Sequence, residues 1–314
     1  MERAEEFCCH ERPQGHAVSR PARLGVGVIS AGRVGSVVGA ALARSGHAVV
    51  AASGISAASQ ARAERMLPGV PLKPPDEVAA AADLVLLAVP DDELAGLVRG
   101  LAATGSWRPG QIVIHTSGAH GLDVLAPAAE AGALPLALHP VMTFTGRSED
   151  LDRLTACSVG VTAAAGDEAA WSVGEALTVE MGAEPVRVPE AARALYHAAL
   201  AHGANHLITL VEDCADLLRG AGIGNAERML GPLLSAALDN ALRHGDRALT
   251  GPVARGDTGT LRKHLGVLEA TEPAIVPAYT SLARRTVQRA EAAGLLDAGA
   301  AAEITELLER PEHP

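Results

Sequence analysis

Two glycines, Gly32 and Gly35, stand in a short turn between an apolar stretch and a helical one. In a G-x-G-x-x-G turn, the second glycine lets a pyrophosphate approach the backbone and the third lets the helix pack closely on the strand. The helix beginning there would direct free amide groups at the phosphates. Ser30 replaces the first glycine, so the turn must avoid a positive φ there or bear strain. The pattern predicts a dinucleotide site, with an ordinary glycine-rich turn as the alternative. Its members are Ser30, Ala31, Gly32, Arg33, Val34 and Gly35.

The end of the second predicted strand bears on which dinucleotide would fit. Enzymes that use NAD place Asp or Glu about 20 residues after the glycines, where the carboxylate accepts the ribose hydroxyls. Here Ser53 and Ser56 occupy that segment, and no carboxylate is present to repel a 2′-phosphate. Arg33, Arg62 or Arg65 could supply charge, although each could equally be a solvated helix residue. The pattern favours NADP over NAD.

Polar residues follow other predicted strands as well, at the sheet edge where α/β proteins bind ligands. Val89, Pro90 and Asp91 end the third strand and would line the cofactor, although Asp91 could simply cap the next helix. Ser117 follows the fourth strand, and His139 follows the fifth, just before a proline. An imidazole that titrates near neutrality could exchange a proton with a substrate. The alternative is a structural histidine in a proline-fixed turn.

A long helix predicted over 191–221 carries Tyr196, a candidate for substrate binding, together with His197 and Asn205. The last two are about 80° apart around a helix and can share a broad face, which makes them candidates for catalysis or substrate positioning. On the same helix, His202 and His206 have the i, i+4 spacing of zinc ligands. No third ligand is evident, so we predict no metal and interpret the pair as a packed or solvated face.

Arg255 and Asp257 lie in a glycine- and proline-rich stretch, residues 249–257. An arginine there could bind a substrate carboxylate through two hydrogen bonds. The two side chains could equally pair to hold the loop or a dimer contact.

Strand and helix patterns alternate from Leu24 to residue 188, which predicts an α/β fold with a doubly wound, parallel Rossmann sheet. After Pro189 only helical patterns occur, with a loop at 250–257. We therefore expect a disordered leader over 1–22, a dinucleotide-binding domain over 23–189, and an all-helical substrate and dimerisation domain over 190–314. The predicted strands are 24–29, 47–52, 83–89, 111–115, 134–138, 158–162 and 184–188.

The composition excludes several other classes of function. A net charge of −11 and an aromatic content of 2% argue against nucleic-acid binding. No apolar run approaches the ~18 residues of a membrane span. The absence of an apolar signal stretch and the small number of cysteines indicate a cytoplasmic protein. Cys8, Cys9 and His10 resemble metal ligands, but they lack a second pair at a suitable spacing, so we interpret them as part of a flexible tail.

From about Leu24 the chain resembles the actinobacterial proteins that join a Rossmann-like domain to a domain of unknown function. Three stretches carry the resemblance, namely residues 27–35, residues 194–197 with Asn205, and residues 249–257. These proteins belong to a broader group whose second domain is like that of 6-phosphogluconate dehydrogenase. The resemblance implies a helical second domain that dimerises, and an active site between the domains.

Looser similarity extends to prephenate dehydrogenases, pyrroline-5-carboxylate reductases and ketopantoate reductases. Prephenate dehydrogenases have a serine and a His-Pro in places comparable to Ser117 and His139-Pro140, and there the histidine bonds the substrate hydroxyl. Hydroxyacid dehydrogenases of this superfamily and ketopantoate reductases use a lysine on the first helix of the second domain. The chain has only Lys73 and Lys263, and neither is on that helix. The specific activities of those two groups are therefore in doubt.

Together these patterns predict an oxidoreductase that transfers hydride between NADP(H) and a small polar carbonyl, alcohol or imine. A ketopantoate reductase-like enzyme is the more specific alternative. A non-catalytic NADP-binding regulatory protein is a second, and an assembly protein with a vestigial dinucleotide fold is a third.

Overall fold

The computed structural model describes residues 23–309, and the segment Cys8-Cys9-His10 of the expected leader lies outside this range. The chain divides into two compact units, residues 1–200 and 201–314. The division falls within α8 (Arg193–Gly220), the helix that follows the last strand. The first turns of α8 therefore belong to the unit that contains the sheet.

A seven-stranded sheet in the order β2-β1-β3-β4-β5-β6-β7 forms the centre of the first unit. Strands β1 to β5 pair in parallel, which confirms the doubly wound fold class. β6 runs antiparallel to β5, and β7 runs parallel to β6. This edge differs from the all-parallel sheet expected from the sequence, because strand–helix alternation alone does not fix strand direction. The strands are β1 (Gly25–Ile29), β2 (Ala48–Ala52), β3 (Leu84–Leu87), β4 (Ile112–His115), β5 (Leu134–Pro140), β6 (Ser158–Thr162) and β7 (Glu184–Arg187).

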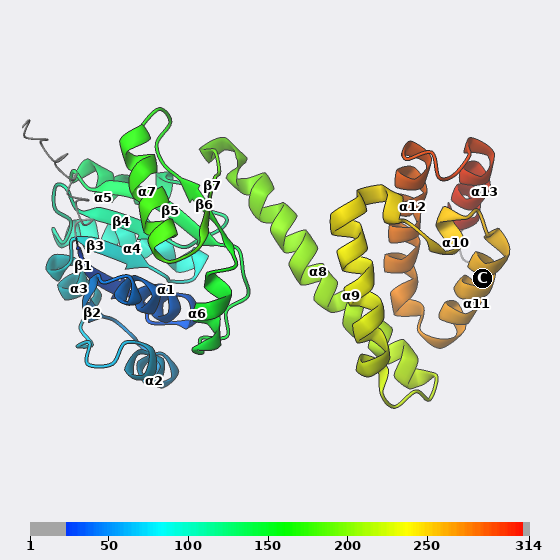
Figure 1. Cartoon of the computed structure of the whole chain (residues 1–314), viewed down its shortest axis with the longest axis horizontal. Coiled ribbons are helices and arrows are strands. Elements are labelled where there is room, and N and C mark those ends of the chain that lie inside the picture. The colour runs from blue at the N-terminus through cyan, green and yellow to red at the C-terminus, as the bar shows by residue number, and fades with distance from the viewer. Residues whose placement is uncertain (1–22, 310–314) are drawn as a thin grey trace, which may run out of the picture. The chain divides into compact units, whose positions relative to one another are not determined.

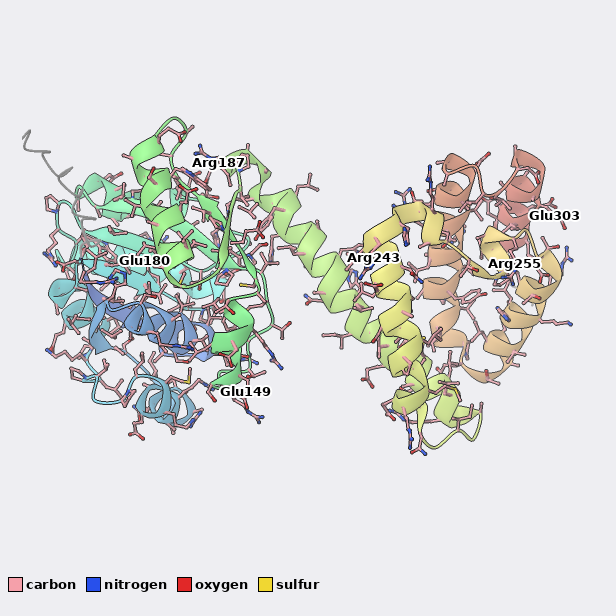
Figure 2. The ribbon with its side chains drawn as sticks, in the orientation of Figure 1. Glu149, Glu180, Arg187, Arg243, Arg255 and Glu303 are labelled. Carbon is pink, nitrogen blue, oxygen red and sulfur yellow. The ribbon has the colours of Figure 1, made fainter. Side chains whose placement is uncertain are left out.

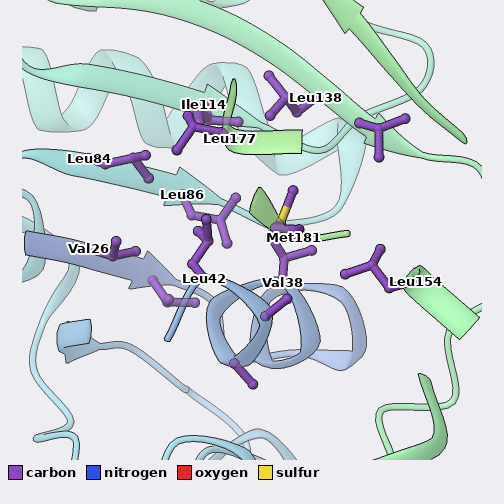
Figure 3. Close-up of a cluster of buried hydrophobic side chains, with 14 of the residues drawn as sticks. Val26, Val38, Leu42, Leu84, Leu86, Ile114, Leu138, Leu154, Leu177 and Met181 are labelled. Carbon is purple, nitrogen blue, oxygen red and sulfur yellow. The ribbon is translucent and has the colours of Figure 1, made fainter. Parts of the chain in front are cut away.

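Helices cover both faces of the sheet (Figure 1). On one face, strand residues pack against α1, α6 and α7, as Figure 3 shows for Leu86 between Val38 and Leu177. On the other face, the strands pack against α3, α4 and α5. Burial on both faces explains why strands such as β3 are continuous apolar runs. The helices are α1 (Arg33–Arg44), α2 (Ala57–Met66), α3 (Pro75–Ala81), α4 (Asp91–Ala103), α5 (Ala126–Glu130), α6 (Glu149–Leu154) and α7 (Glu168–Glu180), with 3-10 turns η1 (Asp123–Leu125) and η2 (Glu190–Ala192).

In the second unit, the described residues 201–309 form helices and connecting loops around a core that includes Leu261, Val287 and Ile304. The expected loop at 250–257 contains a short helix, α10 (Gly251–Ala254). Pro252 lies in its first turn, where a missing N–H costs nothing. The other elements are α9 (Ala226–His244), η3 (Gly245–Ala248), α11 (Thr258–Thr271), η4 (Pro273–Ile275), α12 (Val276–Ala292) and α13 (Ala298–Glu309).

Within residues 23–309, no helix combines the length and the apolar character that a membrane span requires.

Candidate cofactor site and active site

The turn after β1 has an unusual backbone conformation and is fixed by hydrogen bonds. Ser30 adopts a φ of 72°, the only positive φ of a non-glycine residue within residues 23–309. The serine at the first glycine position therefore bears strain. The Ser30 N–H donates to Ser53 Oγ at 2.9 Å, and the Ala31 N–H donates to the Ser53 carbonyl oxygen at 2.7 Å. Ser53 thus fixes the turn against the end of β2.

The two glycines of the turn have different surroundings. A Cβ added to Gly35 would lie 2.2 Å from the Ser30 carbonyl oxygen and 2.9 Å from the Ala88 Cβ, so α1 can pack this closely only without a side chain. A Cβ added to Gly32 would meet only Ser30 Oγ, at 3.5 Å. Gly32 is the N-cap of α1 and has a φ of −69°, which any residue can adopt. Its lack of a side chain leaves open space at the helix N-terminus, where an anion is favoured.

A pocket of about 820 Å³ opens at this turn. Its volume is within the usual range for small-molecule sites. Five of the ten residues predicted to bind the cofactor line it: Ser30, Gly32, Arg33, Ser53 and Val89. The other five do not line it: Ala31, Val34, Gly35, Pro90 and Asp91. Of these, Pro90 is the N-cap of α4, and the Asp91 carbonyl oxygen lies 3.0 Å from His120 Nε2.

Arginines also line this pocket. Arg33 comes from α1 and Arg62 from α2, and Ser56 lies near them as the N-cap of α2. Arg65, the third arginine considered from the sequence, donates to the Ala61 carbonyl oxygen at 3.0 Å and does not line the pocket. The structure therefore separates the three arginines: two face the pocket and one does not.

A second group of polar side chains lies at the ends of β4 and β5, still within the first unit. The Nδ1 atom of His139 lies 2.8 Å from the Tyr196 hydroxyl oxygen, and the two rings are edge-on. Gly160 of β6 pairs with His139 across the antiparallel strands, and a Cβ on Gly160 would lie 2.5 Å from that hydroxyl oxygen. A glycine in β6 thus makes room for Tyr196 to reach His139.

His197 completes this group from the next position on α8. Its ring centroid is 6.4 Å from that of His139, at an interplanar angle of 86°. Gly118 lies between the two rings, because a Cβ added there would be 2.8 Å from His197 Cδ2 and 2.9 Å from His139 Nε2. Three predicted site residues, His139, Tyr196 and His197, are therefore neighbours.

The imidazole of His139 is neutral at physiological pH. Burial, and secondarily the positive charge of Arg193, lower the pKa of His139 to about 4. The sequence-based expectation of titration near neutrality is therefore wrong for this histidine. Burial also raises the pKa of the Tyr196 hydroxyl, so this group keeps its proton. His139 and Tyr196 are therefore both uncharged, and each carries one proton on a nitrogen or oxygen atom that can be exchanged.

Ser117 shapes the loop after β4. Its Oγ accepts hydrogen bonds from the N–H groups of Ala119 and His120, at 3.2 and 3.0 Å. Its own N–H donates to Nδ1 of the buried His115 at 3.2 Å, and its carbonyl oxygen accepts from Arg193. These bonds fix the loop that carries Gly118, so Ser117 is a structural residue of the loop that lies between the two histidines.

The remaining predicted site residues lie in the second unit. Asn205 is exposed on α8. Asp257 is the N-cap of α11: its carboxylate accepts from the Thr260 N–H at 2.9 Å. Arg255 is exposed just after α10 (Figure 2). Asp257 thus has a structural role that the sequence alternatives did not include, and a substrate role for Asn205 or Arg255 stays a prediction.

Metal binding has no geometric support in the described residues. His202 and His206 lie with their Nδ1 atoms 2.9 Å apart on α8. Within residues 23–309, no group of three His, Cys, Asp or Glu side chains could hold a metal ion.

Two family models match the chain in succession: a Rossmann-like domain over residues 10–140, and the domain of unknown function DUF2520 over residues 157–286. The chain belongs to the family that joins these two domains. No curated protein matches this Rossmann–DUF2520 sequence.

Solved structures share the fold at low sequence identity. A protein from Bacteroides fragilis, described provisionally as an NADP oxidoreductase, has a TM-score of 0.69 at 20% identity, over 84% of this chain and 98% of its own. An imine reductase variant from Myxococcus stipitatus in complex with NAD+ has a TM-score of 0.58 at 18% identity, over 90% and 99%. A pyrroline-5-carboxylate reductase from Coxiella burnetii has a TM-score of 0.54 at 16% identity, over 92% and 100%. The Rossmann–DUF2520 chain therefore shares its fold with these three structures.

Sequence reasoning missed three residues that build the site of this Rossmann–DUF2520 protein. His115 ends a buried strand just before Ser117, and that position could have marked it. Gly160 could be found only by knowing that β6 lies antiparallel to β5. Arg193 is 2% exposed, and its Nη1 donates to Thr162 Oγ1 at 2.9 Å. Nothing in the sequence distinguishes this arginine from a surface one.

Proposed function

We propose that this protein is an NADP-dependent oxidoreductase that transfers hydride between NADP(H) and a small polar carbonyl, alcohol or imine. The observation that carries the proposal is the pocket at the Ser30–Gly35 turn. Its lining includes Gly32, at the open N-terminus of α1, together with Arg33 and Arg62. Residues 53–56, after β2, include no carboxylate that would repel a 2′-phosphate. The similar fold of an NAD+-bound imine reductase supports a nicotinamide cofactor.

The residues present fit such a cofactor. The open space over Gly32 admits a pyrophosphate, and the amides at the start of α1 would bind it. Arg33, Arg62 and Ser56 would hold a 2′-phosphate. When bound, the nicotinamide would supply or accept the hydride, and the chain must supply or accept a proton.

His139 and Tyr196 are the proposed source of that proton. If the Tyr196 hydroxyl donates to Nδ1, the single ring proton of the neutral imidazole is on Nε2, which faces Gly118. Nε2–H would donate to the substrate oxygen or nitrogen as negative charge develops there. Proton loss from Nε2 is balanced by transfer from Tyr196 to Nδ1. The resulting phenolate is stabilised by the guanidinium of Arg193, 5.7 Å from the Tyr196 ring centroid.

The test is substrate-dependent oxidation of NADPH, followed by its absorbance, with small ketones, 2-oxoacids and cyclic imines offered in parallel. We expect turnover with one of these classes and loss of that turnover in Tyr196→Phe. Tight NADPH binding without oxidation by any class would instead favour a non-catalytic protein that responds to the cofactor.

We also propose that the protein is a homodimer. Several large apolar side chains of α8 and α9 are exposed in the second unit, among them Ile208, Leu233 and Leu242 at 62%, 63% and 79%. Apolar surface gathered on two helices is typical of an association face. Sedimentation equilibrium at micromolar concentration should give twice the chain mass, and Leu233→Asp should reduce it. A monomeric mass for the wild type would contradict the proposal.

A further inference from the structure

The loop after β5 packs on the two arginines that line the cofactor pocket. Gly146 is buried and has a φ of 77°. A Cβ added there would lie 2.7 Å from Cδ and Nε of Arg62 and 3.1 Å from Cγ of Arg33. The backbone of Gly146 therefore lies against both arginine stems, although the three residues come from different elements.

This turn is held by one fully buried carboxylate. Asp150, on α6, has no exposed surface. It accepts from the N–H groups of Thr145 and Gly146, each at 2.7 Å, and from the Thr145 hydroxyl at 3.1 Å. Burial raises the pKa of Asp150, but these hydrogen bonds outweigh it and hold the pKa below its usual value. An ionised side chain thus fixes the position of Gly146.

The two guanidinium groups are left available for a ligand. Arg33 and Arg62 both line the pocket, and within residues 23–309 neither forms an ion pair or a hydrogen bond through its side chain. Two unpaired cations whose stems touch one glycine match the charge of a phosphate monoester. Holding the stems in place lowers the rotamer entropy lost when the anion binds.

We propose that Asp150 is a positioning residue for cofactor specificity. By holding the 145–147 turn against Arg33 and Arg62, it sets these guanidinium groups to bind a dianionic phosphate monoester, the 2′-phosphate of NADP(H). This inference rests on the proposed cofactor and adds to it a residue that does not line the pocket. Asp150 touches neither the cofactor nor the substrate.

The test compares two probes that differ in the 2′-phosphate, 2′,5′-ADP and 5′-AMP, by isothermal titration calorimetry. Charge-assisted hydrogen bonds to a phosphate are worth about 10- to 100-fold in affinity, which is the loss we expect for 2′,5′-ADP in Arg62→Gln. In Asp150→Asn, the affinity for 2′,5′-ADP should fall by a smaller factor, about 5- to 30-fold. The affinity for 5′-AMP should stay within about twofold in both variants, because its phosphate would bind at the start of α1.

Matched controls come from the same helices. Asp152→Asn changes an exposed carboxylate of α6, and Arg65→Gln an arginine of α2 outside the pocket. Both should retain wild-type affinity for each probe. If Asp150→Asn does not fold, Gly146→Ala tests the same contact between the turn and the arginines. Its Cβ would displace Arg62, and the same selective loss is expected.

The outcomes separate this inference from the proposed function. A wild type that binds both probes equally would overturn the NADP preference and this inference with it. A wild type that prefers 2′,5′-ADP, with a preference unchanged in Asp150→Asn or Gly146→Ala, would overturn only the role of Asp150. Equal weakening of both probes in Arg62→Gln would show that the arginine binds the shared 5′-phosphate, and it would overturn the inference.

Discussion

The two glycines of the turn should separate folding from cofactor binding. In Gly35→Ala, the new Cβ would lie 2.2 Å from a backbone oxygen and 2.9 Å from the Ala88 Cβ, whereas carbon contacts are comfortable at about 3.5–4.0 Å. Overpacking of this kind costs about 1–3 kcal/mol, and a rigid backbone partner favours the upper half of that range. Since a domain of this size loses about 2–4 °C per kcal/mol, Tm should fall by about 4–12 °C.

Gly32→Val should have the opposite effect: it should change stability little and weaken cofactor binding strongly. Its Cβ would have only Ser30 Oγ nearby, at 3.5 Å, so the change at the N-cap should cost at most about 1 kcal/mol. The added carbons would occupy the space proposed for the pyrophosphate, and NADPH affinity should fall by about 10- to 100-fold or more.

Thermal unfolding and fluorescence titration with NADPH, applied to both variants, give the readouts. Normal NADPH binding by a folded Gly32→Val protein would show that this turn is not the phosphate site. Wild-type stability of Gly35→Ala would refute the packing argument.

Three other changes test separate parts of the structure. Ser30→Gly should raise Tm, because a positive φ costs a non-glycine residue about 1 kcal/mol or more; an unchanged or lower Tm would count against strain at the turn. Once a substrate is found, His139→Ala should lower turnover by roughly 10²–10⁴-fold and leave NADPH affinity unchanged. Full turnover in His139→Ala with loss in His197→Ala would instead assign the acid to His197. Burial lowers the pKa of His115 to about 4 from 6.5, so the unfolded chain binds a proton that the native state does not. The first unit should therefore lose stability as pH falls from 6.5 toward 4, and the dependence of Tm on pH over this window should be shallower in His115→Gln. An equal dependence in that variant would show that other groups cause the loss.

The sequence predicted the parts of the site that depend on local pattern. The Gly32–Gly35 spacing identified a turn in which Gly35 permits close helix packing and Gly32 leaves open space at the start of α1. All seven strands could be located from the sequence, and for inner strands such as β3 the signal was an apolar run, because a strand buried on both faces needs no polar alternation.

The parts that depend on pairing across the sheet were not predictable from the sequence. The direction of β6, and with it the place of Gly160 beside Tyr196, follows from tertiary packing. The pKa of His139 depends on how deeply it is buried and on Arg193, which is distant in sequence. Nor does residue type distinguish Asp150, which is fully buried, from Asp152, whose side chain is 87% exposed.

The central claim is that the pocket at the Ser30–Gly35 turn binds NADP(H), and parallel titration of the wild-type protein with NADPH and NADH tests it most directly. Charge-assisted bonds from Arg33 and Arg62 to the 2′-phosphate predict NADPH binding tighter by at least about tenfold, and Ser53→Asp should narrow the difference. Equal or tighter binding of NADH, or no binding of either dinucleotide, would contradict the account.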